Sequence, residues 1–231
     1  MTPKKDTKAL IIETLKEKAC LKQKVFKQTT SIFQDFKAQG EQLANELKTE
    51  MHKIDKDVKI DFINKGDHEF HLKFGGDILV FYMHTNVFDF ERSHNIWNSS
   101  YIKEDELRVY CGMINVYNFL ADSFKFNRVN DLGYLVARCF FNKDLHYFVE
   151  GKRQLGFLYN DFINEVITPK KIKEIIESAI LYSLDFDLLT PPYNTMQEVS
   201  VHDIKEVTNA MNIKTGKRLG FKFQADNDLI E

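Results

Sequence analysis

The sequence predicts an α+β protein in which a multi-stranded, meander-like antiparallel sheet is flanked by helices and preceded by a long N-terminal amphipathic helix. Over residues 8–54 and 172–184, apolar residues recur every three or four positions, as they do on one face of a helix. Between residues 58 and 159 the apolar period is two, which is typical of strands. The connections there are short, and short connections require neighbouring strands to be antiparallel.

The N-terminal segment is expected to be one long helix or a helical pair, because residues 8–54 contain no proline and a single glycine. Glycine in a helix interior costs about 1 kcal/mol relative to alanine, so Gly40 marks the expected kink or break. A helix this long packs on a sheet or on a second copy of itself, which predicts a homo-oligomer or a protein partner bound through this helix. The apolar face comprises Ile11, Leu15, Val25, Ile32, Phe36, Leu43, Leu47, Met51 and Ile54.

The sheet is predicted to begin with a hairpin over residues 58–74 that turns at Asn64–Asp67 and keeps one wet face, carrying His71 and Lys73. A Gly75–Gly76 turn then opens an interior strand that is apolar on both faces. Residues 94–106 are polar and predict a surface excursion. Further strands are expected at 108–118, 123–129, 133–141, 145–150 and 155–159.

The C-terminal part is predicted to return to helix. Thr168 and Pro169 provide an N-cap and a first-turn proline for a helix that covers the sheet. Residues 190–194 predict a loop, followed by a helix starting near Ser200 and Asp203 and an edge strand at 218–223. Three segments result: the N-terminal helix (1–57), the sheet core with its covering helix (58–189) and a C-terminal extension (190–231).

Composition excludes several classes of protein. The net charge is −2, and nine lysines against four acidic residues in residues 1–37 indicate a solvated basic helix face, with no support for a nucleic-acid footprint.

No apolar stretch is long enough for a signal peptide or a membrane span, which predicts a cytoplasmic protein with no membrane association. Cys20, Cys111 and Cys139 form no CxxC pair, so reduced thiols are expected. Signatures of P-loop, dinucleotide-binding, serine-hydrolase and zincin enzymes are missing.

A short stretch occurs twice, as EGKRQLGFLY at 150–159 and TGKRLGFKF at 215–223. The simpler interpretation is two turns that lead into strands, with the glycine supplying a positive φ. The sharper hypothesis is that the two turns meet at one end of the sheet and bind phosphate or another small anion through Lys152, Arg153, Lys217 and Arg218. Trp97 and Tyr101, in the polar excursion, are the candidates for stacking on a ligand or contacting a partner.

Two groups of residues are candidates for chemistry. Glu150 and Lys152 match the Glu-x-Lys element of PD-(D/E)xK nucleases, in which a second carboxylate, here Asp131 or Asp144, helps to hold Mg²⁺. The segment 84–94 brings together residue types that bind zinc or iron, but their spacing matches no metal pattern, so no metal site is predicted there. Its four candidate residues are His84, Asp89, Glu91 and His94.

The sequence favours a non-enzymatic binding or regulatory protein that needs no cofactor. Its predicted order of elements resembles the general plan of PAS-like and GAF-like sensory modules, on the layout of the fold alone. The expected ligand is a small, nucleotide-like anion or a protein partner, with dimerisation through the N-terminal helix. Two alternatives stay open: a Mg²⁺-dependent nuclease of the PD-(D/E)xK kind and a structural subunit of a larger assembly.

Overall fold

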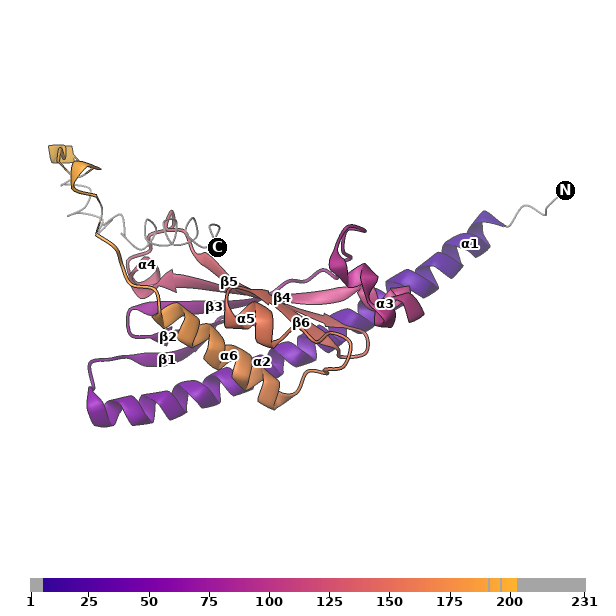
Figure 1. The fold of residues 1–231 in the computed structure, drawn as a ribbon, viewed down its shortest axis with the longest axis horizontal. Helices are drawn as coiled ribbons and strands as arrows, with labels where there is room; N and C mark the ends of the chain where they lie inside the picture. The colour runs from indigo at the N-terminus through magenta and orange to yellow at the C-terminus, as the bar shows by residue number, and fades with distance from the viewer. Residues whose placement is uncertain (1–5, 191, 196, 203–231) are drawn as a thin grey trace.

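The computed structural model describes residues 6–202, apart from 191 and 196. Its N-terminal part is one unbroken helix, made of α1 (Thr7–Thr14), a π-helical stretch η1 (Leu15–Ala19) and α2 (Cys20–Ile54). The predicted long helix is confirmed, and the predicted break at Gly40 is wrong. Residues 6–20 are all exposed, and this end of the helix extends well beyond the rest of the protein (Figure 1).

Within the described residues, six strands form one antiparallel sheet in which each strand pairs with the next along the chain. The predicted meander is therefore confirmed, as are the hairpin turn at residues 64–67 and the turn at Gly75–Gly76. The strands are β1 (Ile60–Asn64), β2 (Glu69–Phe74), β3 (Asp77–Met83), β4 (Cys111–Leu120), β5 (Tyr134–Asn142) and β6 (Tyr147–Gly151).

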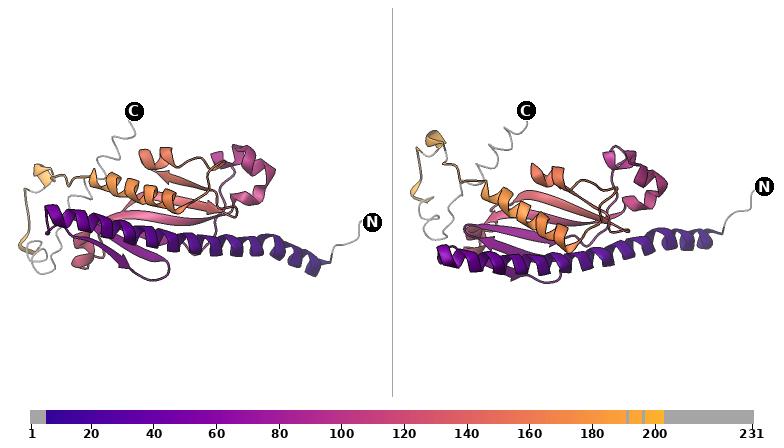
Figure 2. Two further views of the ribbon diagram at one scale, coloured as in Figure 1. Left: turned by 90° about the horizontal axis from the view of Figure 1, so that it is seen from below. Right: turned by 60° about the horizontal axis from the view of Figure 1, so that its bottom comes forward.

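The main core lies between one face of the sheet and two helices, α2 and α6 (Pro169–Leu184), which run side by side (Figure 2). Thr168 caps α6 as predicted, because its hydroxyl oxygen accepts a hydrogen bond from the Lys171 amide. The apolar face of α2 between Val25 and Met51 is thus buried on the chain's own sheet. The large apolar residues of this helix that stay exposed lie before Val25 and at its C-terminal end, where Ile54 is 79% exposed.

Two glycines allow α2 to lie close to the sheet. A Cβ atom on Gly40 would come 3.1 Å from the ring of Phe70, so this glycine serves helix–sheet packing and not a helix break. At Gly112 in β4 the approach is closer still, since a Cβ atom there would lie 1.9 Å from the hydroxyl oxygen of Thr29. Thr29 is fully buried in α2. The helix is held against the sheet by residues that leave no spare volume.

The opposite face of the sheet is also partly covered. Three short helices of the excursion, η2 (Asn95–Asn98), α3 (Ser100–Glu104) and η3 (Glu106–Val109), pack on Phe140 and Phe148. Further along, α4 (Ala121–Lys125) places Phe124 against His71, with ring centroids 5.0 Å apart. The expectation of a wet face at His71 is therefore wrong: the side chain is 2% exposed.

Two predicted strands are helices in the structure. Residues 123–129 contain most of α4, which ends where Asn127 adopts a positive φ of 48°. Residues 155–159 form most of α5 (Gln154–Leu158) because the chain reverses at Arg153, whose φ is 50°. Gly151 is not the positive-φ residue of that turn. Gly156 lets the turn close, since a Cβ atom there would lie 2.3 Å from the Gly151 oxygen.

Some of the remaining predictions concern the described residues, and others concern residues that the structure does not describe. Cys111 and Cys139 are buried free thiols and Cys20 is an exposed one, as expected. Tyr193–Thr195 form a short 3-10 turn inside the predicted loop. Val201 and His202 are helical, where the sequence predicts a helix to start near Ser200 and Asp203, and the continuation of that helix and the strand expected at 218–223 lie outside the described residues.

The contact between Thr29 and Gly112 predicts a specific destabilisation. We expect Gly112→Ala to lower the free energy of unfolding by about 1–3 kcal/mol, because the new methyl group overpacks the interface. Thr29→Ala in the same chain should restore part of the loss, a coupling that urea denaturation of the double-mutant cycle measures. Gly76→Ala is the control, since a Cβ atom there meets nothing within 4 Å. Equal effects at positions 76 and 112 would contradict this account.

Burial of His71 predicts a pH-dependent stability. Burial holds the pKa of His71 below its usual value, an effect that Glu69, 2.6 Å away, opposes only in part. The unfolded chain therefore binds a proton that the folded chain excludes, so stability should fall as the pH drops below about 6.5. His71→Gln should flatten that fall in urea denaturation at pH 7 and pH 5, and His52→Gln, an exposed position, should not. Parallel profiles for wild type and His71→Gln would refute the prediction.

Candidate ligand-binding cleft

A cleft of about 680 Å³ lies between the start of the excursion, the end of β6 and the segment that follows α5. A slightly larger hollow of about 750 Å³ follows α2, but residues of that one helix line it, so it encloses nothing. The cleft is the better candidate because three separate segments converge on it. Its polar lining residues are Ser93, His94, Asn95, Ser99, Glu150, Asn160 and Asp161.

His94 and Glu150, which the sequence placed in two different candidate sites, meet in this cleft. His94 Nδ1 accepts a hydrogen bond from the Ile96 amide and so caps η2. In the neutral ring this leaves the proton on Nε2, which faces a Glu150 oxygen at 3.4 Å. The other Glu150 oxygen pairs with Arg138, directly opposite on β5. Both carboxylate oxygens of Glu150 are thus engaged, one by His94 of the excursion and the other by Arg138 of the sheet.

The rest of the cleft combines an apolar floor with hydrogen-bond acceptors. Phe148 and Phe162 form the floor, with ring centroids 5.1 Å apart. Asp161 lies at the rim, where it accepts hydrogen bonds from the amide and the side chain of Asn164. In the part of the chain that the structure describes, the lining includes two carboxylates and no lysine or arginine. The lining itself is therefore acidic, and Arg138 beside it offsets the charge of Glu150.

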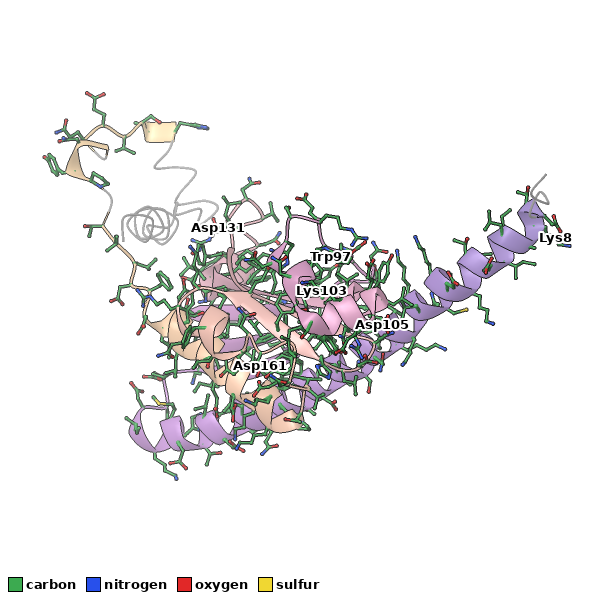
Figure 3. All side chains as sticks on the ribbon, turned by 45° about the vertical axis from the view of Figure 1, so that its right-hand side comes forward. Lys8, Trp97, Lys103, Asp105, Asp131 and Asp161 are labelled. Carbon is green, nitrogen blue, oxygen red and sulfur yellow. The ribbon has the colours of Figure 1, made fainter. Side chains whose placement is uncertain are left out.

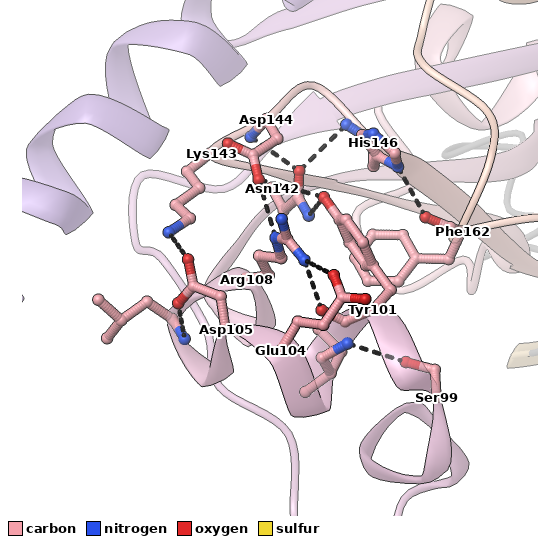
Figure 4. Close-up of polar contacts among 12 residues, drawn as sticks. Ser99, Tyr101, Glu104, Asp105, Arg108, Asn142, Lys143, Asp144, His146 and Phe162 are labelled. Carbon is pink, nitrogen blue, oxygen red and sulfur yellow. Dashed lines mark hydrogen bonds and ion pairs between the residues drawn. The ribbon is translucent and has the colours of Figure 1, made fainter.

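The excursion that forms one wall of the cleft is held by a polar network at the β5–β6 turn (Figure 4). Tyr101 lies between two flat groups: the Arg108 guanidinium at 4.1 Å from its ring centroid and the His146 ring, stacked at 4.6 Å. Arg108 also pairs with Asp144 at 3.2 Å, and Lys143 pairs with Asp105. Burial raises the pKa of Tyr101. This cluster fastens the excursion to the sheet and leaves no open space for a ligand.

Asn142 is the centre of that network. It is fully buried, and its side-chain oxygen accepts hydrogen bonds from the amides of Asp144, at 2.9 Å, and His146, at 3.0 Å. Its side-chain nitrogen donates to the Tyr101 hydroxyl oxygen at 3.0 Å. One amide side chain therefore shapes the tight turn and connects it to the excursion.

Among the described residues, those predicted to contact a ligand do not share one surface. Tyr101 is buried in the network, and Trp97 is half-buried, with its indole N–H donating to the Phe90 carbonyl and Arg92 over its ring. Lys152 and Arg153 lie beside a hollow between α5 and α6, where Arg153 pairs with Asp185 at 3.3 Å. Lys217 and Arg218 are outside the described residues, and so is any meeting of the two GKR turns.

Asp131 and Asp144, the two alternative carboxylate partners of Glu150 in the nuclease hypothesis, lie at opposite ends of β5. Asp131 precedes β5 and pairs with Arg128, whereas Asp144 follows β5 and belongs to the Tyr101 network. A nine-residue strand separates them by roughly 30 Å. Glu150 contacts Arg138 and His94 instead, and it belongs neither to the Asp131 pair nor to the Tyr101 network. Among the described residues, no three His, Cys, Asp or Glu side chains are arranged to hold a metal ion.

The other candidate metal residues have local roles. His84 Nδ1 accepts a hydrogen bond from the Asn86 amide, and Asp89 accepts one from the Phe90 amide. Glu91 is exposed. The signal that sequence reasoning missed is the series of helix caps at His94, Ser99 and Asp105, each of which accepts an amide hydrogen bond two or three residues ahead. These caps fold the polar excursion into the wall of a cleft.

Comparison with known proteins supplies no family for this chain. No protein-family model, no curated protein and no solved structure matches it. In the described residues, no helix has both the length and the apolar character needed to cross a bilayer. The function must therefore be argued from the cleft and the surface.

Asn142 carries a testable prediction for the cleft wall. Asn142→Ala should lower the free energy of unfolding by about 3 kcal/mol, because three buried hydrogen bonds each contribute about 1 kcal/mol. Urea denaturation measures the change, with Asn45→Ala, exposed on α2, as the matched control. A loss below about 1 kcal/mol would show that water replaces the missing groups.

Proposed function

We propose that this protein is a non-enzymatic binding protein that holds a small organic cation in the cleft between the excursion and β6. The observation that carries the proposal is that Glu150 and Asp161 line one cleft together with Phe148 and Phe162, whereas Arg138, the partner of Glu150, is not part of the lining. Carboxylates at a rim and aromatic faces below are the groups that recognise amines, through charge-assisted hydrogen bonds and cation–π contacts. A primary or quaternary amine has the matching chemistry.

The hydrogen bonds of the cleft support binding more than catalysis. His94 uses Nδ1 as a cap acceptor and points Nε2 at Glu150, so neither ring nitrogen is directed at an open volume as a base. Ser99 donates to the Ile96 carbonyl and accepts from the Ile102 amide, which occupies its hydroxyl group. A nucleophile beside a free general base is what covalent catalysis requires. These two side chains lack that arrangement.

The charge of the cleft changes the ligand class that the sequence favoured. A nucleotide-like anion would meet Glu150 and Asp161, and the basic pair Lys152–Arg153 belongs to a different, smaller hollow of about 150 Å³. An anion sensor and a Mg²⁺-dependent nuclease both remain as alternatives with distinct ligands. The same binding assay separates all three.

The test is a thermal-shift series on the purified chain with putrescine, spermidine and choline, and in parallel with AMP, cyclic AMP, inorganic phosphate and Mg²⁺. A ligand that binds only the folded state raises Tm, by an amount equivalent to about 2.7 kcal/mol at a hundredfold excess over Kd. We expect at least one amine to raise Tm. Glu150→Gln combined with Asp161→Asn should remove that shift, and the exposed Asp187→Asn should preserve it.

Each other result contradicts the proposal in its own way. A shift with nucleotides alone would favour the anion sensor, and a shift with Mg²⁺ that Glu150→Gln abolishes would favour the nuclease. An amine shift that survives the double substitution would place the ligand outside the cleft. A flat series would remove small amines as the ligand class.

A further inference from the structure

The N-terminal end of the long helix is a separate exposed surface. Residues 7–24, comprising α1, the π-helical stretch and the first turn of α2, project from the protein, with Lys8 at the far tip (Figures 1 and 3). Leu10, Ile11, Ile12 and Leu15 are each about half exposed. An isolated helix of this length is marginal in water. Burial of these apolar side chains against another surface would be favourable in free energy.

The position of the apolar residues around the helix indicates the shape of what covers them. Successive residues turn by about 100°, so Leu10 and Ile12 point to nearly opposite sides. A flat surface such as a bilayer buries one side of a helix and leaves the other in water. Burying Leu10 together with Ile12 requires a groove or neighbouring helices.

Charge argues against a direct pairing of two such helices. Residues 7–24 carry five lysines and two glutamates, so two copies side by side would repel. The remainder of the molecule is oppositely charged: residues 1–37 hold nine lysines against four acids, net +5, whereas the whole chain is −2, which leaves −7 on residues 38–231. The basic helix therefore complements the body of another copy better than it complements its own equivalent.

The body presents a matching acceptor surface on α5 and the last turns of α6. Phe157 is 84% exposed, and Leu158, Leu181 and Leu184 are each more than half exposed. A hollow of about 150 Å³ lies between the two helices, lined by Leu181 and also by Lys152 and Arg153, of which Arg153 is paired with Asp185. The C-terminal end of α6 carries the negative end of the helix dipole, and Asp187 and Glu177 add negative charge close to it in the chain.

We propose that residues 7–24 of one copy pack on the α5–α6 surface of a second copy, and the reverse, in a symmetric dimer. The reciprocal arrangement is isologous, so it closes at two copies and doubles the buried area. Lysines at positions 8, 16 and 18 lie against the acidic end of α6. This inference does not rest on the ligand cleft, which shares only Gly156 of α5 with the two surfaces.

Sedimentation equilibrium of the full chain over a concentration series tests the dimer. We expect a dimer whose dissociation constant rises at high salt, since the contact pairs basic and acidic surfaces. Leu15→Ser and Leu181→Ser should each raise that constant about tenfold or more. Val129→Ser, at a comparably exposed position outside both surfaces, should leave it unchanged. Unchanged melting temperatures establish that the variants are folded.

A mixing experiment distinguishes this dimer from a coiled coil. When Leu15→Ser is mixed with Leu181→Ser, the heterodimer keeps one of its two contacts intact, so the mixture should dimerise more strongly than either variant alone. If the helices pair with each other, Leu181→Ser dimerises like wild type and mixing gains nothing, which overturns the proposal. A wild-type chain that stays monomeric at every concentration and salt overturns it as well.

Discussion

The packing of α2 on the sheet is the interaction on which the rest of the structure depends. Phe33 and Phe36 are fully buried and contact Phe70, Phe81 and Phe141 at ring-centroid distances of 5.5–6.2 Å. The sheet residues Phe70 and Phe81 stack at 4.5 Å beneath them. A six-stranded meander has one large apolar face, and burial of that face is the main free-energy gain on folding. Because the sheet is shorter than the helix, the helix must also project beyond it.

The second face of the sheet carries the excursion and the cleft. Polar side chains on this face hold the excursion in place. Asn142 and Tyr101 connect it to the β5–β6 turn, and His94 caps its first helix. Once fastened, the excursion stands beside β6 and the chain after α5, and a cleft remains between them. The same segment therefore serves as a covering layer at one end and as a wall of the cleft at the other.

Much of the fold was predictable because its signals are local. The apolar period of α2, the cap and proline of α6 and the turn residues at 64–67 and 75–76 each act over a few positions. The errors have tertiary causes. Gly40 predicts a helix break from the sequence, but in the structure it makes room for the ring of Phe70. Residues 155–159 alternate like a strand, but the turn at Arg153 and Gly156 folds them back as a helix.

By itself, the sequence determined the α+β class, the long first helix, the antiparallel meander and the free thiols, because periodicity, capping and spacing are properties of short segments. Only the tertiary structure decided which polar residues meet. Glu150 and His94 are 56 positions apart and belong to different motifs, and they converge because the excursion docks on the sheet. Asp131 and Asp144 are 13 positions apart, and they are separated because a whole strand lies between them. Distance along the chain carries no information about such contacts once the chain crosses a sheet.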